Sequence, residues 1–253
     1  MKDFSYLKKV VFCLFPITSQ PAFGQDFWAD DLSYSITSQS QLECKVLNCS
    51  ASSQNVVIPP TVSYNNRTYT VKEIGDKAFL HKKIISITIP HTVRSIGNYA
   101  FSYCDQLTEI ILPPSIKTIG YAAFNNCHKL QFVVIPSSIT SIGGGILYNV
   151  ANDCEIFNLS NKDILSDCPN IYTKDNCITF KNHRFPYTGK EPHAEYINNL
   201  KAYRLELRPN ESLGKAPGQY TMTWTATFTE GEHTVTFNNV PYTYTIVSSS
   251  PKK

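Results

Sequence analysis

The sequence predicts a mainly β protein in which a short repeat solenoid is followed by a small β-sandwich. Two observations predict the solenoid. A dipeptide recurs every 22 or 23 residues, and a strand-like phrase ending in proline follows its first three copies. The dipeptides are Ile74-Gly75, Ile96-Gly97, Ile119-Gly120 and Ile142-Gly143. Units this short cannot bury their own apolar faces, so they must stack around one shared core. The sandwich is predicted by the strict alternation of apolar residues with threonine from Tyr220 to Phe228.

The first 24 residues predict a signal peptide. Lys8 and Lys9 precede the apolar run of residues 10–15, and Ala22 and Gly24 supply the small residues before a cut at Gln25. A membrane anchor is the alternative, but this run is too short to cross about 30 Å of hydrocarbon. We therefore expect a protein that is secreted, at the cell surface or periplasmic, with no membrane insertion after cleavage.

Charge and motif content exclude several functions. Removing residues 1–24 takes away three lysines and one aspartate, which lowers the formal net charge from +3 to about +1. The remaining basic residues are scattered, so we expect no nucleic-acid partner. The six histidines show no metal-ligand spacing, and no nucleophile or acid–base pair has a recognisable pattern. We expect no catalytic site, no bound metal and no cofactor.

Each position of the repeat has a physical task. The glycine after each isoleucine is expected to permit a positive-φ corner, and the first, fourth and sixth residues of each strand phrase are expected to point inward. An Ala-Phe pair follows each of the first three dipeptides, and we expect its phenylalanine to fill the wide part of the coil. Phe79, Phe101 and Phe124 should therefore form one interior row.

This pattern resembles the BspA-like leucine-rich repeat, in register over residues 71–143. Residues 57–60 and 64–71 resemble the family's entry segment, so residues 25–70 are expected to form an N-terminal β capping segment. The fourth copy degrades after Ile146, which assigns residues 71–160 to the repeats with a degenerate cap, whose damaged strand is 154–157. The resemblance implies a secreted or surface-displayed, non-catalytic protein that adheres to an extracellular or host surface protein.

The outward residues of the strand phrases form the candidate ligand-binding site. Side chains alternate across a strand, so Glu109 and Ile111 should face outward from one coil, and Phe132 and Val134 from the next. Neighbouring strands lie roughly 4.8 Å apart, so the three apolar members should form one patch. The alternative is that the C-terminal domain covers this patch.

Seven cysteines remain after cleavage. Cys104 and Cys127 occupy the same place in adjacent coils, and two stacked free thiols are favoured there over a disulfide. A disulfide between Cys168 and Cys177, or between Cys154 and either of these, would staple the segment that follows the repeats.

Residues 161–177 are expected to be a linker, and residues 178–253 a second domain. Its segments 187–190 and 216–221 resemble bacterial immunoglobulin-like modules, which implies an immunoglobulin-like β-sandwich acting as a spacer. As an alternative function, exposed aromatic residues would bind a glycan. Trp224 is a weak candidate for this, because it lies on the strand face expected to be the core.

Overall fold

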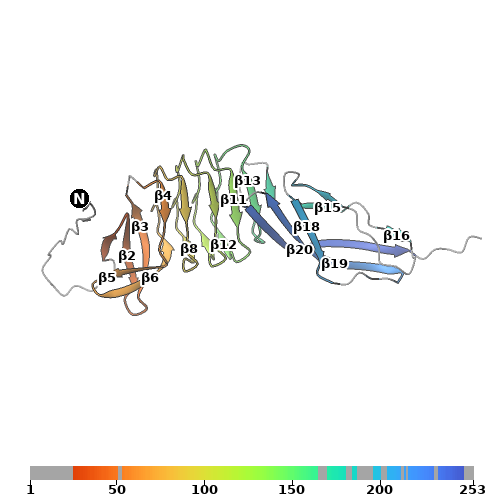
Figure 1. Ribbon diagram of the computed structural model, residues 1–253, viewed down its shortest axis with the longest axis horizontal. Helices are drawn as coiled ribbons and strands as arrows, with labels where there is room; N and C mark the ends of the chain where they lie inside the picture. The colour runs from red at the N-terminus through yellow and green to blue at the C-terminus, as the bar shows by residue number, and fades with distance from the viewer. Residues whose placement is uncertain are drawn as a thin grey trace, which may run out of the picture.

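The computed structural model describes residues 25–50, 53–164, 170–180, 184–186, 196–200, 204–211, 214, 216–230 and 233–247. The predicted signal peptide, Cys168 and the 187–190 motif lie outside these residues. All helical or strand structure in the described part of the chain is β, in twenty strands. The molecule is elongated, with the stacked coils of the repeats followed by a separate β domain (Figure 1).

One sheet contains eight strands and runs along one side of the coils. Its order is β1-β2-β3-β6-β8-β10-β12, and β5 pairs with β6. The bounds are β1 Asp26–Ala29, β2 Leu32–Ser38, β3 Glu43–Cys49, β5 Thr61–Tyr64, β6 Arg67–Ile74, β8 Ser95–Ile96, β10 Thr118–Ile119 and β12 Ser141–Ile142. From β3 onward the path of this sheet is parallel, whereas β1 and β2 form an antiparallel hairpin that covers the outer edge of β3.

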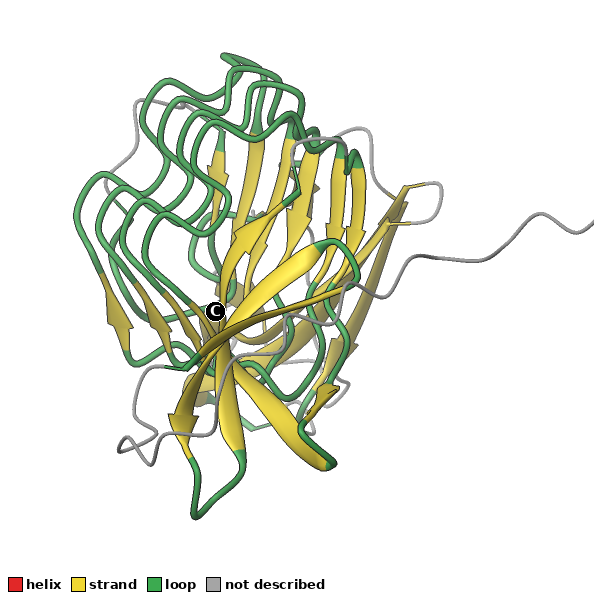
Figure 2. Ribbon diagram, turned by 90° about the vertical axis from the view of Figure 1, so that its left-hand side faces the viewer, coloured by secondary structure: helices red, strands yellow, loops and turns green. Residues whose placement is uncertain are grey.

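A second row of parallel strands lies across the coils from the first sheet, and stacked turns connect the two rows (Figure 2). It consists of a pair, β4 (Asn55–Val57) and β7 (Ser86–Thr88), and a four-stranded sheet in the order β9, β11, β13, β14. The latter strands are β9 Glu109–Ile111, β11 Phe132–Ile135, β13 Glu155–Asn158 and β14 Ile171–Tyr172. The amide of Thr108 donates to the carbonyl of Ile85 at 3.4 Å, which links the two sets.

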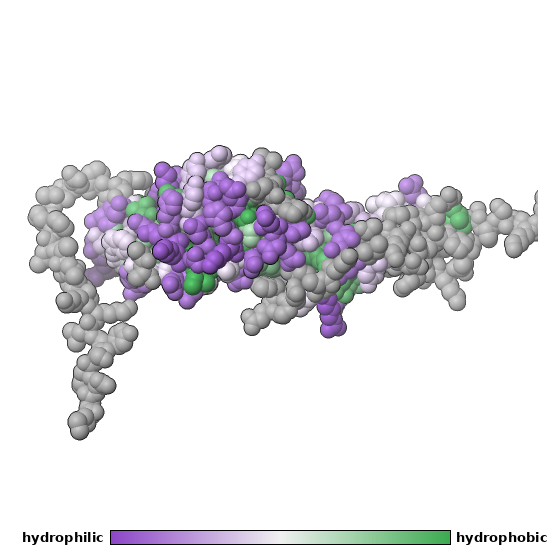
Figure 3. Space-filling view, turned by 90° about the horizontal axis from the view of Figure 1, so that it is seen from above, coloured by the Kyte–Doolittle hydropathy of each residue, from purple (hydrophilic) through white to green (hydrophobic). Residues whose placement is uncertain are grey.

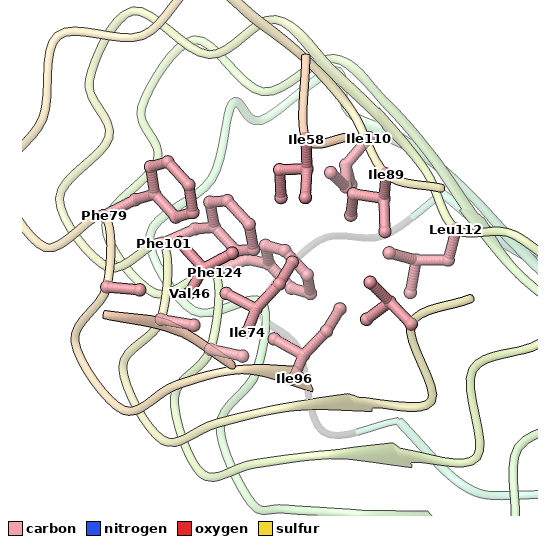
Figure 4. Close-up of a cluster of buried hydrophobic side chains, with 14 of the residues drawn as sticks. Val46, Ile58, Ile74, Phe79, Ile89, Ile96, Phe101, Ile110, Leu112 and Phe124 are labelled. Carbon is pink, nitrogen blue, oxygen red and sulfur yellow. The ribbon is translucent and has the colours of Figure 1, made fainter. Parts of the chain in front are cut away.

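The interior of the coils confirms the predicted row of phenylalanines (Figure 4). The ring centroids of Phe79 and Phe101 are 4.9 Å apart, those of Phe101 and Phe124 are 5.3 Å apart, and all three side chains are fully buried. Their main chains are laddered as well, because the amide of Phe79 donates to Ala100 and that of Phe101 to Ala123. The core is therefore continuous along the repeats.

The predicted role of the repeat glycines is wrong. Gly75, Gly97, Gly120 and Gly143 do not adopt positive φ. They are required by close approach, because a Cβ on Gly97 would lie 2.5 Å from the amide nitrogen of Asp76, and one on Gly120 would lie 2.5 Å from that of Asn98. At this position the backbones of adjacent coils touch without side chains between them.

The left-handed corners lie at two other positions of each coil, and most of them carry side chains. The first follows the glycine by two residues, with φ of 59° at Lys77, 56° at Tyr99 and 51° at Ala122. The second lies four residues further on and is occupied in the same three coils by His81, Tyr103 and Asn126, each with φ of 59°. Few non-glycine residues adopt this conformation, so the corners are strained positions.

The strand ladder extends further than the sequence predicts. The damaged strand of the fourth copy is present as β13, which pairs in parallel with β11. Beyond it, β14 pairs in parallel with β13. The interval 161–177, predicted as a linker, thus contributes a strand to the repeats.

The C-terminal domain is a β structure, but an immunoglobulin-like arrangement is not confirmed. It has a four-stranded sheet in the order β16-β20-β19-β18 and a two-stranded ribbon of β15 and β17. The bounds are β15 Ile178–Phe180, β16 Arg184–Pro186, β17 Tyr196–Asn198, β18 Arg204–Pro209, β19 Gly218–Glu230 and β20 His233–Val247. The predicted alternation holds along β19, where Met222, Trp224 and Phe228 are buried, while the hydroxyls of Thr227 and Thr236 lie 3.1 Å apart across the strands.

Cys44, Cys49, Cys104, Cys127 and Cys177 are free and buried, as expected for the pair in adjacent coils, Cys104 and Cys127. The thiol of Cys104 donates to the carbonyl of Phe79 at 3.1 Å, and that of Cys127 to the carbonyl of Phe101 at 3.2 Å. Burial raises the pKa of Cys127 to about 12 and that of Cys104 further, so both are protonated at neutral pH. Each thiol therefore ties its coil to the preceding one and is a poor nucleophile.

Candidate binding face

The strand face consists of the outward side chains of the second row of strands. The registers within each set of strands arrange them in two lines along the molecule, and equivalent places in the repeat continue each line from β7 to β9. The first line is Asn55, Ser86, Glu109, Phe132 and Glu155; the second is Val57, Thr88, Ile111, Val134, Phe157 and Tyr172. All four predicted site residues lie on this face. Glu109 and Phe132 are neighbours in the first line, and Ile111 and Val134 in the second.

The C-terminal domain covers one end of the strand face. Phe132 is only 7% exposed and Phe157 is fully buried, with 5.3 Å between their ring centroids. The ring of Phe157 also lies 6.3 Å from that of Phe237 in β20, and Val134 packs against the same cluster. The apolar face of β19 and β20 is buried in part by packing against these outward side chains of the repeats. The interpretation of Phe132 as part of an open patch is therefore corrected in favour of the covering alternative.

The other end of the strand face remains exposed. Val57 is 69% exposed and Ile111 is 51% exposed, with exposed Thr88 between their strands. In the adjacent line the hydroxyl of Ser86 donates to the side-chain carbonyl of Asn55 at 2.8 Å, so polar side chains flank the apolar ones. We call Val57, Thr88, Glu109 and Ile111 the open half of the strand face. It is polar at one margin, with Glu109, and carries the apolar side chains of Val57 and Ile111 at the other.

Exposed tyrosines on the turns were missed by the sequence reasoning. Tyr99, Tyr103, Tyr121 and Tyr148 are 37–53% exposed, and the rings of Tyr99 and Tyr121 meet edge to face at 5.5 Å. The sequence contains a signal for this contact, because Tyr99 and Tyr121 are separated by the length of one coil. Viewed from above, the repeats present a mainly hydrophilic surface with small, separate hydrophobic patches (Figure 3).

The described residues show no group of three or more His, Cys, Asp or Glu side chains that is able to hold a metal ion. A helix long and apolar enough to span a bilayer is also lacking in the part of the chain that the structure describes. The predicted sugar-binding candidate Trp224 is 8% exposed and packs in the C-terminal core.

Comparison with protein families gives one match. Residues 72–188 match the BspA type leucine rich repeat region, in six copies, which exceeds the four dipeptides seen in the sequence. A comparison with curated proteins finds no match.

Several solved structures similar to this chain are leucine-rich repeat proteins of bacteria. One from Bacteroides capillosus is 24% identical over 58% of this chain and 97% of its own, with a TM-score of 0.47. One from Bacteroides ovatus is 29% identical over 52% of this chain and 40% of its own, with a TM-score of 0.39. A leucine rich cell surface protein from Faecalibacterium prausnitzii is 17% identical over 66% of this chain and 65% of its own, with a TM-score of 0.42.

Proposed function

Because residues 72–188 carry the BspA-type leucine-rich repeat, we propose that the protein is a non-catalytic adhesion protein. It is secreted or displayed at the cell surface, and it binds another extracellular protein through the open half of the strand face. The observation that carries this proposal is the contrast along one line of side chains. Val134 and Phe157 are packed against the C-terminal domain, whereas Ile111 is left 51% exposed.

The open half has the composition of an interface centre with a polar margin. Full burial of one aliphatic side chain contributes about 1.5–3 kcal/mol, so Ile111 and Val57 together are able to anchor a partner. Glu109 and the bonded pair of Ser86 and Asn55 supply polar contacts beside them. Because the strands are held in a ladder of hydrogen bonds, the face is rigid before binding and loses little entropy when it binds.

Charge substitution at Ile111 tests the proposal. Residues 25–253 are measured against a panel of purified extracellular-matrix and plasma proteins, and binders are then titrated with the Ile111→Asp variant. A loss of affinity of tenfold or more with an unchanged melting temperature is expected. Trp28→Asp is the matched control, since Trp28 is 60% exposed on β1, which belongs to the other sheet. Equal affinities of Ile111→Asp and the unsubstituted protein for every binder would contradict the proposal.

The exposed tyrosines favour glycan binding as a second candidate function. Tyrosine rings that expose one face stack on sugar rings, and Tyr121 is 53% exposed above the glycine row. A glycan array separates the two functions. Glycan signals lost in Tyr121→Ala and kept in Ile111→Asp support this candidate, and an array without signals rejects it.

A further inference from the structure

A pocket of about 480 Å³ lies at the N-terminal end of the repeats. It is bounded by β4, by β5 and by the turn between β1 and β2. Its floor is apolar, because the lining residues Val56, Val62 and Tyr34 are buried, and its rim carries the exposed carboxylates of Asp30 and Asp31. The pocket thus offers an apolar recess beside two negative charges.

One wall of the pocket is the outer edge of β4. On its inner side β4 is laddered to β7, where the amide of Ile58 donates to Thr88 at 3.0 Å and the carbonyl of Gln54 accepts from Ile85 at 2.7 Å. Main-chain groups of successive strand residues point to opposite edges. The N–H and C=O groups of Asn55 and Val57 therefore point away from β7, on the side where the pocket lies. Among the described residues, no strand pairs with this outer edge.

The N-terminal cap explains why this edge is open. The hairpin of β1 and β2 covers the outer edge of β3, which is the first strand of the repeats in the larger sheet. In the second row of strands, β4 occupies the corresponding end position and pairs only with β7 in the described part of the chain. The cap therefore completes one row of strands, while at the end of the other row no described strand pairs with the outer edge of β4.

We propose that this pocket binds an extended peptide segment of another protein, which adds to β4 as an extra strand. An exposed strand edge is a template for such pairing, in which main-chain bonds supply affinity and alternate side chains supply selectivity. One apolar side chain of the peptide enters the recess above Val56 and Val62. A lysine or arginine of the same peptide lies against Asp30 and Asp31, so the preferred segment alternates apolar residues with polar ones and carries a basic residue.

The proposed peptide uses main-chain groups of β4, at the N-terminal end of the strand face, together with the two aspartates, and it does not use the exposed side chain of Ile111. The probe is a library of capped hexapeptides that alternate valine or leucine with threonine and end in either lysine or glutamate. We expect lysine peptides to bind at least tenfold more tightly than their glutamate counterparts, and to slow amide hydrogen exchange at Asn55 and Val57. Asp30→Asn combined with Asp31→Asn should abolish the preference for lysine, while Ile111→Asp should change neither quantity.

Main-chain pairing is tested by a matched pair of variants. Val57→Pro removes an N–H that faces the pocket and keeps the bond between Ile58 and Thr88, since proline is tolerated where the N–H lies on the free edge of a strand. It should weaken peptide binding at least tenfold, whereas Val57→Thr should bind as the unsubstituted protein does. Peptides methylated on every second nitrogen extend the test without altering the protein, because only one of the two methylation phases should block binding.

Three results would each overturn the inference. The first is that no peptide of the library binds at millimolar concentration. The second is that peptides bind Val57→Pro and Val57→Thr equally and also tolerate both methylation phases. The third is that amide exchange at Asn55 and Val57 is unchanged when a peptide is bound.

Discussion

Placing a methyl group between two coils at Gly120 tests how tightly the coils are stacked. In Gly120→Ala the new Cβ would lie 2.5 Å from the amide nitrogen of Asn98 and 2.6 Å from the carbonyl carbon of Gly97. Ordinary contacts of a Cβ begin at 3.4 Å, so the spacing would have to open by up to 0.9 Å. The neighbouring backbone is fixed, because the amide of Gly120 donates to Ile96 and that of Gly143 donates to Ile119, each at 2.8 Å.

The expected loss is large for one methyl group. Overpacking costs about 1–3 kcal/mol, and the smaller unfolded-state entropy of alanine offsets only about 0.4–1 kcal/mol of this. A net loss of about 1–2 kcal/mol corresponds to a fall in melting temperature of about 2–8 °C for a protein of this size. Thermal and guanidinium unfolding followed by circular dichroism measure both quantities.

Gly144→Ala is the matched control for this experiment. The nearest atoms to a Cβ at Gly144 belong to the ring of Tyr121 at 3.7 Å, which is an ordinary contact. We expect Gly144→Ala to be neutral or slightly stabilising. A Gly120→Ala protein that melts with or above Gly144→Ala would refute the argument that contact between coils fixes the glycine.

Three further predictions concern the core, the domain contact and the thiols. Phe101→Ala should lower the free energy of unfolding by about 3–5 kcal/mol in urea titrations, since it empties the middle of the stacked row; a loss below 1 kcal/mol would contradict a continuous core. Phe132→Ala should speed protease cleavage between residues 160 and 178, because its side chain joins the repeats to the C-terminal cluster; unchanged cleavage would mean that the contact is dispensable. Burial raises the pKa of Cys127 from its ordinary value of 9.0 to about 12, so the stability that it contributes is full below pH 9 and is lost between pH 9 and 12. Each such thiol should make the free energy of unfolding fall by about 1.4 kcal/mol per pH unit in that window, and Cys127→Ala should reduce this slope; equal slopes would exclude the thiol as the cause.

Local pattern was sufficient to predict the coil and its interior. The side chains of Phe79, Phe101 and Phe124 recur at the pitch of the repeat, and this recurrence alone places them in one row. The role of the glycines was assigned wrongly because a sequence shows that a side chain is absent and does not show why. Positive φ and close approach both demand glycine, and only the distance from Gly120 to the preceding coil distinguishes them.

The outward direction of the candidate site side chains was predictable from the sequence, but their exposure to solvent was not. Alternation along the strands correctly turned Phe132 and Ile111 outward, since that property depends on neighbours in sequence. Which of the two remains open depends on Phe237 and its neighbours, more than 100 residues later in the chain. The edge of β4 escaped prediction for a related reason, because strand pairing is a property of the assembled sheet.

The left-handed corners combine a cost in backbone stability with exposed aromatic side chains. A non-glycine residue in this conformation costs about 1 kcal/mol relative to glycine, and Tyr99 and Tyr103 adopt it with side chains that are 37% and 42% exposed. Substitution of either tyrosine by glycine would relieve the backbone strain and would also remove the aromatic ring. A variant that gains heat resistance and loses its ligand would identify these bends as positions where selection has favoured recognition over rigidity.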